Sequence, residues 1–155
     1  DLVKVETAQQ MHDAVHAQVD AGCDMLIMAA AVADYTPQTM ADQKIKKTAS
    51  GGTNLTLELT QTVDILGSLR DKHGFVKVGF AAETQDIERY ALDKLRRKNL
   101  DFIVANDART ALGAADNAVT IFKADGQHWT IERQPKMQVA EHIIDILIEN
   151  IESRH

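Results

Sequence analysis

The sequence of 155 residues contains few cysteines, prolines and aromatic residues. Cys23 is the only cysteine, which excludes an internal disulfide. No basic residue flanks Cys23 to favour a reactive thiolate, so we interpret it as a small buried or semi-buried side chain.

The sequence also lacks long apolar runs and an excess of basic residues. No apolar run approaches the length of a transmembrane helix, and the N-terminus has no signal-peptide pattern, so we expect a cytoplasmic protein without membrane association. The formal net charge of −6 argues against a general nucleic-acid binder, which needs basic residues to neutralise phosphates. The composition is 45% apolar and 26% charged, which is typical of a globular protein, and we expect one domain over residues 1–155.

Helix and strand patterns alternate over the first two thirds of the chain. Thr7 and Gln10 form a capping-box pattern, and the helix that follows is expected to end at Gly22. The apolar run Met25–Ala31 is typical of a strand buried on both faces. Further strands are expected at Leu55–Leu59, Val76–Phe80 and Asp101–Ala105, and further helices at about Val63–Lys72 and after Thr84 or Asp86. This alternation predicts a Rossmann-like α/β fold with three layers, a parallel sheet between helices.

The pattern changes after Asn106. Two strand-like segments, Ala118–Lys123 and His128–Arg133, flank an Asp125-Gly126 turn signal, which predicts an antiparallel hairpin. A final helix with a broad apolar face is expected to begin near Pro135.

Ligands of open parallel sheets bind beyond the carboxyl ends of the strands. The segments expected there are Ala29–Tyr35, Phe80–Thr84 and Asn106–Asp107. Small side chains at Ala29–Ala31 permit close approach to the backbone, and Asp34 is a candidate for a ribose hydroxyl or a magnesium ion. Such alanine-rich strand ends also serve packing alone.

Two groups of lysines are candidates for phosphate contacts. Lys44, Lys46 and Lys47 lie in an expected loop, either as solvated charges or as a flap over a triphosphate. Lys94 and Lys98 share one helix face, either as a basic surface stripe or as nucleotide contacts. The pattern also shows no metal-ligand histidine spacing, no Ser-His-Asp arrangement, and no glycine-rich phosphate loop of the Walker or dinucleotide type.

Several motifs resemble the phosphopantothenoylcysteine synthetase family, also called phosphopantothenate–cysteine ligases. They occur in the family's order over nearly the whole chain: Ala29-Ala30-Ala31-Val32-Ala33-Asp34-Tyr35, Lys44-Ile45-Lys46-Lys47, Val78-Gly79-Phe80-Ala81-Ala82-Glu83-Thr84, Lys98-Asn99-Leu100-Asp101, Val104-Ala105-Asn106-Asp107 and Asp116-Asn117-Ala118. The resemblance implies a two-step ligation in coenzyme A biosynthesis that uses CTP and magnesium. The carboxylate of 4′-phosphopantothenate attacks the α-phosphate of CTP, and the amine of cysteine then displaces CMP.

The resemblance also implies roles for particular residues. Lys44 would be the catalytic flap lysine, Phe80 the aromatic beside the base, and Asp34 a ribose or cation contact. The nucleotide contacts carried over are Ala29, Ala30, Asp34, Lys44, Val63, Asp64, Ile65, Leu66, Phe80, Lys94 and Lys98.

The family's first strand, its glycine- and serine-rich phosphate loop and a reactive asparagine are expected to precede this chain. We therefore expect the chain alone to bind CTP weakly and not to complete the reaction. The resemblance further implies a homodimer and an N-terminal decarboxylase domain, which carries FMN. Two alternatives remain open: a non-catalytic nucleotide-binding module, and a Rossmann-like oxidoreductase domain, which the missing glycine fingerprint disfavours.

Overall fold

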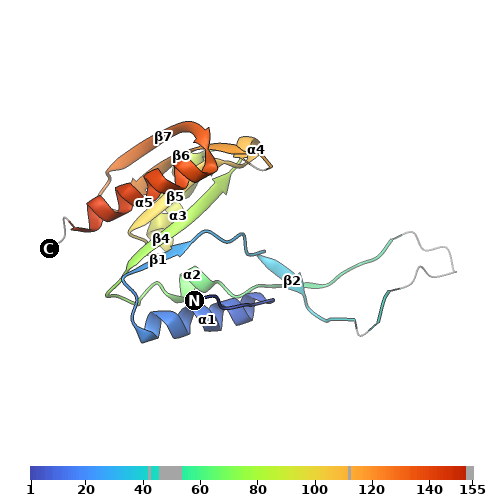
Figure 1. Ribbon diagram of the computed structural model, residues 1–155. Helices are drawn as coiled ribbons and strands as arrows, with labels where there is room; N and C mark the ends of the chain where they lie inside the picture. The colour runs from blue at the N-terminus through green and yellow to red at the C-terminus, as the bar shows by residue number, and fades with distance from the viewer. Residues whose placement is uncertain (42, 46–53, 112, 153–155) are drawn as a thin grey trace.

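The computed structural model describes residues 1–41, 43–45, 54–111 and 113–152. Its elements are α1 (Ala8–Ala21), β1 (Met25–Met28), β2 (Tyr35–Pro37), β3 (Leu59–Gln61), α2 (Ile65–Ser68), β4 (Val76–Glu83), α3 (Ile87–Arg97), β5 (Phe102–Asp107), α4 (Ala108–Ala111), β6 (Asp116–Lys123), β7 (His128–Pro135) and α5 (Lys136–Glu152). Five strands form a sheet in the order β1-β4-β5-β6-β7, and β2 pairs with β3 in a separate small sheet (Figure 1).

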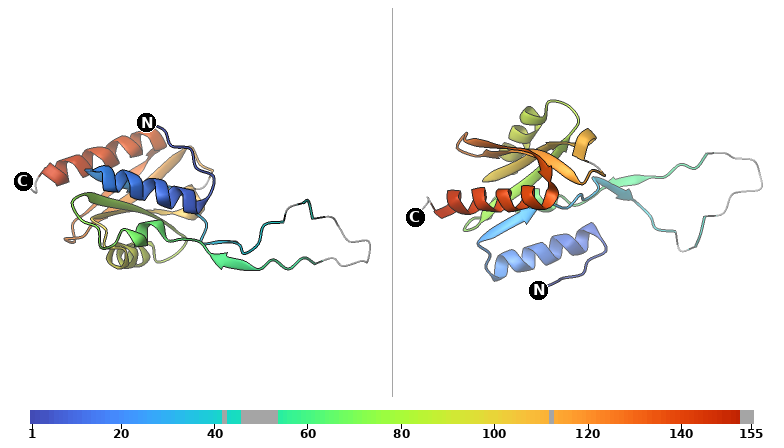
Figure 2. Two further views of the ribbon diagram at one scale, coloured as in Figure 1. Left: turned by 90° about the horizontal axis from the view of Figure 1, so that it is seen from below. Right: turned by 45° about the horizontal axis from the view of Figure 1, so that its top comes forward.

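The main sheet is sandwiched between helices. Strands β1, β4 and β5 are parallel, whereas β6 and β7 are antiparallel. Helix α5 covers one face of the sheet and α3 the other (Figure 2). Along β5, Phe102 belongs to the core cluster with Leu147 of α5, and Ile103 belongs to the cluster with Leu95 of α3, as the alternation of strand side chains requires. The predicted three-layer α/β architecture, its C-terminal hairpin and its terminal helix are confirmed.

Local sequence signals explain where several elements begin and end. The Thr7 hydroxyl accepts from the Gln10 N–H at 3.1 Å, and the Gln10 side chain in return accepts from the Thr7 N–H, so the predicted capping box is formed. Gly126, at φ 95°, supplies the left-handed turn residue between β6 and β7. These signals are local, which is why the sequence alone predicts them.

Three expectations about elements are wrong. Strand β1 ends at Met28 and lies at a sheet edge, so Ile27 is 37% exposed rather than buried between two faces. A strand is expected at Leu55–Leu59, but β3 occupies Leu59–Gln61. Leu55, Leu57 and Leu59 are exposed, and β3 pairs only with β2. Helix α2 has only four residues and is followed by turns.

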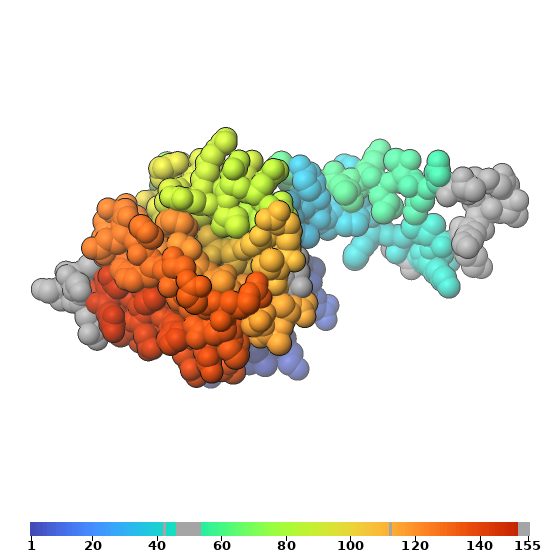
Figure 3. All heavy atoms as spheres, turned by 90° about the horizontal axis from the view of Figure 1, so that it is seen from above, coloured from blue at the N-terminus to red at the C-terminus, as the bar shows by residue number. Residues whose placement is uncertain are grey.

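Strands β2 and β3, with the described residues next to them in the sequence, form an arm. The Tyr35–Pro37 strand, at the start of an expected loop, pairs antiparallel with β3. The described parts of the arm extend away from the main sheet (Figures 1 and 3). In the part of the chain that the structure describes, no helix is long and apolar enough to cross a membrane.

Gly79 of β4 permits close packing of the layer that carries α2 and α3. A Cβ at Gly79 would lie 2.7 Å from Leu100 Cδ1 and 3.2 Å from Leu66 Cδ2, and both leucines are buried. We therefore expect Gly79→Ala to lower the free energy of unfolding by about 1–3 kcal/mol through overpacking. Urea denaturation measures this change. Ala82→Ser, on the same strand but exposed, is the control, and equal stability of the two variants would contradict the packing account.

Candidate functional site

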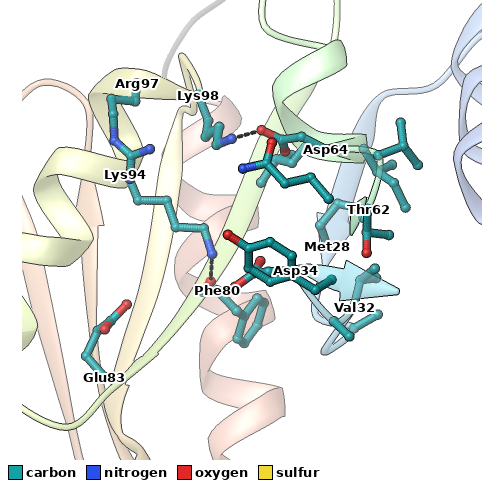
Figure 4. A pocket seen from close by; sticks show the side chains of 17 residues that line it. Met28, Val32, Asp34, Thr62, Asp64, Phe80, Glu83, Lys94, Arg97 and Lys98 are labelled. Atoms are coloured by element: carbon teal, nitrogen blue, oxygen red, sulfur yellow. Dashed lines mark hydrogen bonds and ion pairs between the residues drawn. The ribbon is translucent and has the colours of Figure 1, made fainter. Parts of the chain in front are cut away.

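A cavity of about 590 Å³ lies at the carboxyl ends of β1 and β4, within the size range of ligand sites in proteins. The strand ends contribute Met28, Ala30 and Phe80. The base of the arm, the start of α2 and one face of α3 complete the wall (Figure 4). The position is the one expected for a ligand of a parallel sheet.

Helix α3 supplies the basic side of the cavity through Lys94, Arg97 and Lys98. These residues fall on one helix face because they are three and four positions apart. Asn99, at φ 51°, ends the helix in a left-handed conformation, and its N–H donates to the Arg96 carbonyl at 3.2 Å. The basic residues thus lie in the last turn, where the helix dipole favours positive charge.

Lys94 is half-buried and forms a hydrogen bond with the backbone of β4. Its Nζ donates to the Phe80 carbonyl oxygen at 2.7 Å (Figure 4). Burial lowers the pKa of Lys94, while the nearby carboxylates of Glu83 and Asp34 act in the opposite direction. The hydrogen bond to a strand carbonyl fixes the Lys94 ammonium against the backbone of β4 at the cavity wall.

Asp64 joins α2 to α3. Its carboxylate accepts from the Gly67 N–H at 2.9 Å, which caps the start of α2, and it also pairs with the Lys98 ammonium. The carboxylate lies directly against Gly67, where a Cβ would clash with Asp64 Oδ2. Asp64 therefore sets the position of Lys98 as well as the start of the helix.

The base of the arm is attached to the cavity wall by its backbone. The Thr62 N–H donates to the Asp34 carbonyl at 2.9 Å, which holds the two sides of the arm together where both line the cavity. The Thr62 hydroxyl oxygen is buried and has no hydrogen-bond partner among the described residues. The base of the arm is therefore part of the cavity wall.

Three carboxylates line the cavity, on Asp34, Asp64 and Glu83. Asp64 is engaged by Lys98, which leaves Asp34 and Glu83 as oxygen donors. Among the described residues, no group of three or more His, Cys, Asp or Glu side chains could hold a metal ion. The protein alone therefore offers no complete metal site in this region, and a hard cation would need further oxygen atoms from a ligand.

Most of the predicted site residues come together in this cavity. Its wall includes nine of them: Ala30, Asp34, Val63, Asp64, Ile65, Leu66, Phe80, Lys94 and Lys98. Ala29 is adjacent in sequence but is not part of the wall, and Lys44 lies in the arm, exposed and away from the wall. Lys46 and Lys47 fall outside the described residues.

Asn106 and Asp107, the third predicted segment, do not line the cavity. The Asp107 carboxylate instead binds the Arg109 guanidinium, with Oδ2 2.7 Å from Nη2, and this interaction holds the pKa of Asp107 below its ordinary value. The sheet order places β5 on the far side of β4 from β1, so its end is displaced from the cavity.

Four wall residues, Val32, Ala33, Tyr35 and Glu83, lie in the predicted segments but were not named as contacts. The other four, Met28, Gln61, Thr62 and Arg97, were not predicted to line a site. Arg97 follows Lys94 by three positions, and that spacing was the available signal for it. Gln61 and Thr62 carried no such signal, because their position depends on the pairing of β2 with β3.

The fold and this site define a Rossmann-like α/β domain with a charged ligand cavity at the carboxyl ends of its parallel strands. The sequence profile described as "DNA/pantothenate metabolism flavoprotein C-terminal domain" matches residues 1–151. The chain belongs to this family.

The chain is also similar in sequence to individual named proteins. The chain is 47% identical over 148 residues to the coenzyme A biosynthesis bifunctional protein CoaBC of Bacillus subtilis, which covers 93% of the chain and 36% of the relative. It is 43% identical over 130 residues to the protein of the same name from Escherichia coli K12, covering 80% of the chain and 32% of the relative. The chain thus spans about a third of the length of these relatives.

A solved structure also has the same fold. The crystal structure of the C-terminal domain of a coenzyme A biosynthesis bifunctional protein CoaBC superposes with a TM-score of 0.76 at 37% identity. The match covers 97% of this chain and 66% of that structure.

Proposed function

We propose that this chain is the nucleotide-binding part of a phosphopantothenate–cysteine ligase that acts in coenzyme A biosynthesis. The observation that carries the proposal is the cavity at the ends of β1 and β4, in which Phe80, Lys94 and Lys98 lie together. The names of the relatives, which place them in coenzyme A biosynthesis, support the same pathway for this chain.

The proposed reaction proceeds in two steps. A carboxylate oxygen of 4′-phosphopantothenate attacks the α-phosphorus of CTP, and the bond to the bridging oxygen breaks to release pyrophosphate. The cysteine amine then attacks the acyl carbon of the cytidylate, loses a proton and releases CMP, which leaves an amide. Negative charge develops on phosphate oxygens in the first step and on the acyl oxygen and departing phosphate in the second, so positive groups fixed nearby accelerate both.

The residues of the cavity have distinct tasks in this proposal. The Phe80 ring packs beside the cytosine, and the backbone of Ala30 in the wall, with the adjacent Ala29, approaches the nucleoside closely because both side chains are small. Lys94, held by the Phe80 carbonyl, and Lys98, held by Asp64, contact the nucleotide from one side. The start of α2, from Val63 to Leu66, lines the adjoining part of the wall.

The cavity fits a magnesium ion carried by the nucleotide. Asp34 and Glu83 offer carboxylate oxygens at the wall, and magnesium commonly takes one or two carboxylates together with substrate phosphates and water. The ion supplies charge neutralisation of the phosphates when bound. Asp34 is the residue we propose to hold it or, without it, the ribose.

The catalytic lysine in this proposal is Lys44, in the connection between β2 and β3. The two sides of the arm that carries it are held together by the Thr62–Asp34 hydrogen bond, where both line the cavity. Lys44 itself is exposed and lies outside the wall. This last observation also supports the second candidate, a nucleotide-binding module without catalysis.

Binding of CTP tests the nucleotide site directly. We expect CTP at about 100 times its dissociation constant to stabilise the full protein by about 2.7 kcal/mol, which raises its melting temperature by about 5–10 °C. NAD should have no effect, because the dinucleotide fingerprint is missing from the sequence. Stabilisation by NAD and not by CTP would refute the proposal in favour of an oxidoreductase domain.

The partners proposed for the full protein follow from the same family. We propose a homodimer in which each chain also carries an N-terminal decarboxylase domain with FMN, in line with the word "bifunctional" in the names of the relatives. Strand β7, at the edge of the sheet, is available for pairing between subunits. Analytical ultracentrifugation of the full protein tests the dimer.

A further inference from the structure

Helix α3 presents three cations to the cavity, and the third has no role in the reaction described above. Lys94 and Lys98 are tied down: the Lys94 ammonium donates to the Phe80 carbonyl at 2.7 Å, and the Lys98 ammonium pairs with Asp64. Arg97 lies between them in sequence and lines the same cavity.

The guanidinium of Arg97 forms a hydrogen bond with another described residue through only one of its three nitrogens. Its Nε donates to Asp93 Oδ2 at 2.6 Å, which restrains the plane of the group. Its two Nη groups make no hydrogen bond or ion pair with another described residue, and the side chain is 61% exposed. Arg97 therefore keeps free donors at the cavity, whereas the ammonium groups of the two lysines already have protein partners.

Arg97 is a neighbour of a second cation, Lys94. Arg97 lies close enough to Lys94 to contribute, after burial, to lowering the pKa of that lysine. Figure 4 shows both side chains on the same side of the cavity. Two neighbouring cations repel each other, and an anion bound between them would remove this repulsion.

We propose that the two Nη groups of Arg97 bind a phosphoryl group beyond the α-phosphate of a nucleoside triphosphate. This inference rests on the proposed function and assigns a further contact within the same site. A planar guanidinium with two free nitrogens matches two oxygens of a phosphoryl group, and an ammonium cannot reproduce that geometry. Arg97 then distinguishes the triphosphate from the monophosphate product, which helps CMP to leave.

The alternative is that Arg97 and Asp93 form an ordinary surface pair. Pairs four residues apart on an exposed helix are common and contribute little to stability. A surface pair of this kind would not affect the affinity for CTP more than the affinity for CMP. The dependence of affinity on the number of phosphates therefore distinguishes the two roles of Arg97.

The test compares CTP and CMP binding by isothermal titration calorimetry of the full protein and its variants. We expect Arg97→Gln to weaken CTP binding by about tenfold to a hundredfold and CMP binding by less than about twofold, since only the outer contact is lost. Arg97→Lys should give an intermediate loss for CTP. Arg96→Gln is the matched control, because it removes the same charge from the same helix at a residue outside this cavity.

Two results would overturn the assignment. Arg97→Gln could weaken CTP binding no more than Arg96→Gln, or it could weaken CMP binding as much as CTP binding. If the unmodified protein binds neither nucleotide, the proposed function fails and the Arg97 contact fails with it. If the unmodified protein binds both and only the Arg97 comparison fails, the proposed function stands without this contact.

Discussion

Replacing Lys44 by glutamine is expected to reduce the turnover of amide formation by about 10²- to 10³-fold, the usual effect of removing one preorganised group that stabilises a developing oxyanion. The affinity for CTP should change much less, because Lys44 lies outside the cavity wall. The melting temperature should stay the same, since Lys44 is exposed and makes no hydrogen bond or ion pair with another described residue. Single-turnover kinetics of the full protein with phosphopantothenate, CTP and cysteine measures the first effect.

Lys4→Gln is the control for this experiment, because it removes an equally exposed lysine near the N-terminus. Activity near that of the unmodified protein in Lys44→Gln would contradict the flap role. A variant that binds CTP normally and has lost turnover would separate the ligase from a binding module, for which Lys44 has no chemical task.

Replacing Lys77 by methionine is expected to give the largest loss of stability among the polar substitutions discussed. Lys77 is only 3% exposed, and its ammonium donates to the carbonyls of Leu69, Arg70 and Lys72 at 3.3, 2.9 and 3.0 Å. Methionine would fill the space of the aliphatic chain but leave these carbonyls without that donor. We expect the free energy of unfolding to fall by about 3 kcal/mol, because each unsatisfied buried group costs about 1–3 kcal/mol.

This value is smaller than the sum over three carbonyls for two reasons: the Leu69 carbonyl still accepts from the Lys72 N–H at 3.1 Å, and Lys77 itself carries a penalty. Burial lowers its pKa, so the folded protein opposes the charge that makes these hydrogen bonds, and methionine removes that opposition. Lys72→Met is the matched control: its side chain pairs with Asp20 at the surface, and such exposed pairs contribute about 0–1 kcal/mol. Equal urea midpoints for the two variants would show that the Lys77 hydrogen bonds do not stabilise the fold.

Lys77 also connects the core to the proposed nucleotide site. Its ammonium holds the turns that follow α2, and the start of that short helix provides Asp64 and Ile65 to the cavity. The Lys77 N–H, in addition, donates to Asp101 Oδ2 at 2.8 Å, next to the start of β5. The side of the cavity formed by α2 is therefore positioned from inside the protein.

The parts of the fold that follow from local sequence were predictable. The capping box at Thr7 and the turn at Gly126 depend on neighbours in the sequence, and the alternation of apolar segments indicates the layers. The edge position of β1 was not predictable in this way. A continuous apolar run such as Met25–Ala31 suggests burial on both faces, whereas its exposure depends on which strands pair with it.

The candidate site also has some features that follow from local sequence and others that depend on how distant segments pack. Lys94 and Lys98 were predictable as neighbours because helical spacing puts them on one face. The ion pair of Lys98 with Asp64 spans 34 positions and depends on how α2 packs beside α3. The exposed position of Lys44 likewise depends on the pairing of β2 with β3. The alternation in Leu55–Leu59 predicts that strand too early in the chain, because β3 occupies Leu59–Gln61.

In the proposed reaction, the nucleotide activates a carboxylate as an acyl-cytidylate in the cavity of this domain. The test uses 4′-phosphopantothenate with ¹⁸O in its carboxylate, together with CTP and cysteine, and mass spectrometry of the products formed by the full protein. We expect one ¹⁸O atom in the phosphate of CMP and none in pyrophosphate, because the carboxylate oxygen that attacks the α-phosphorus leaves with CMP. Amide formation with unlabelled CMP, or with the label in another phosphate product, would contradict the proposed reaction.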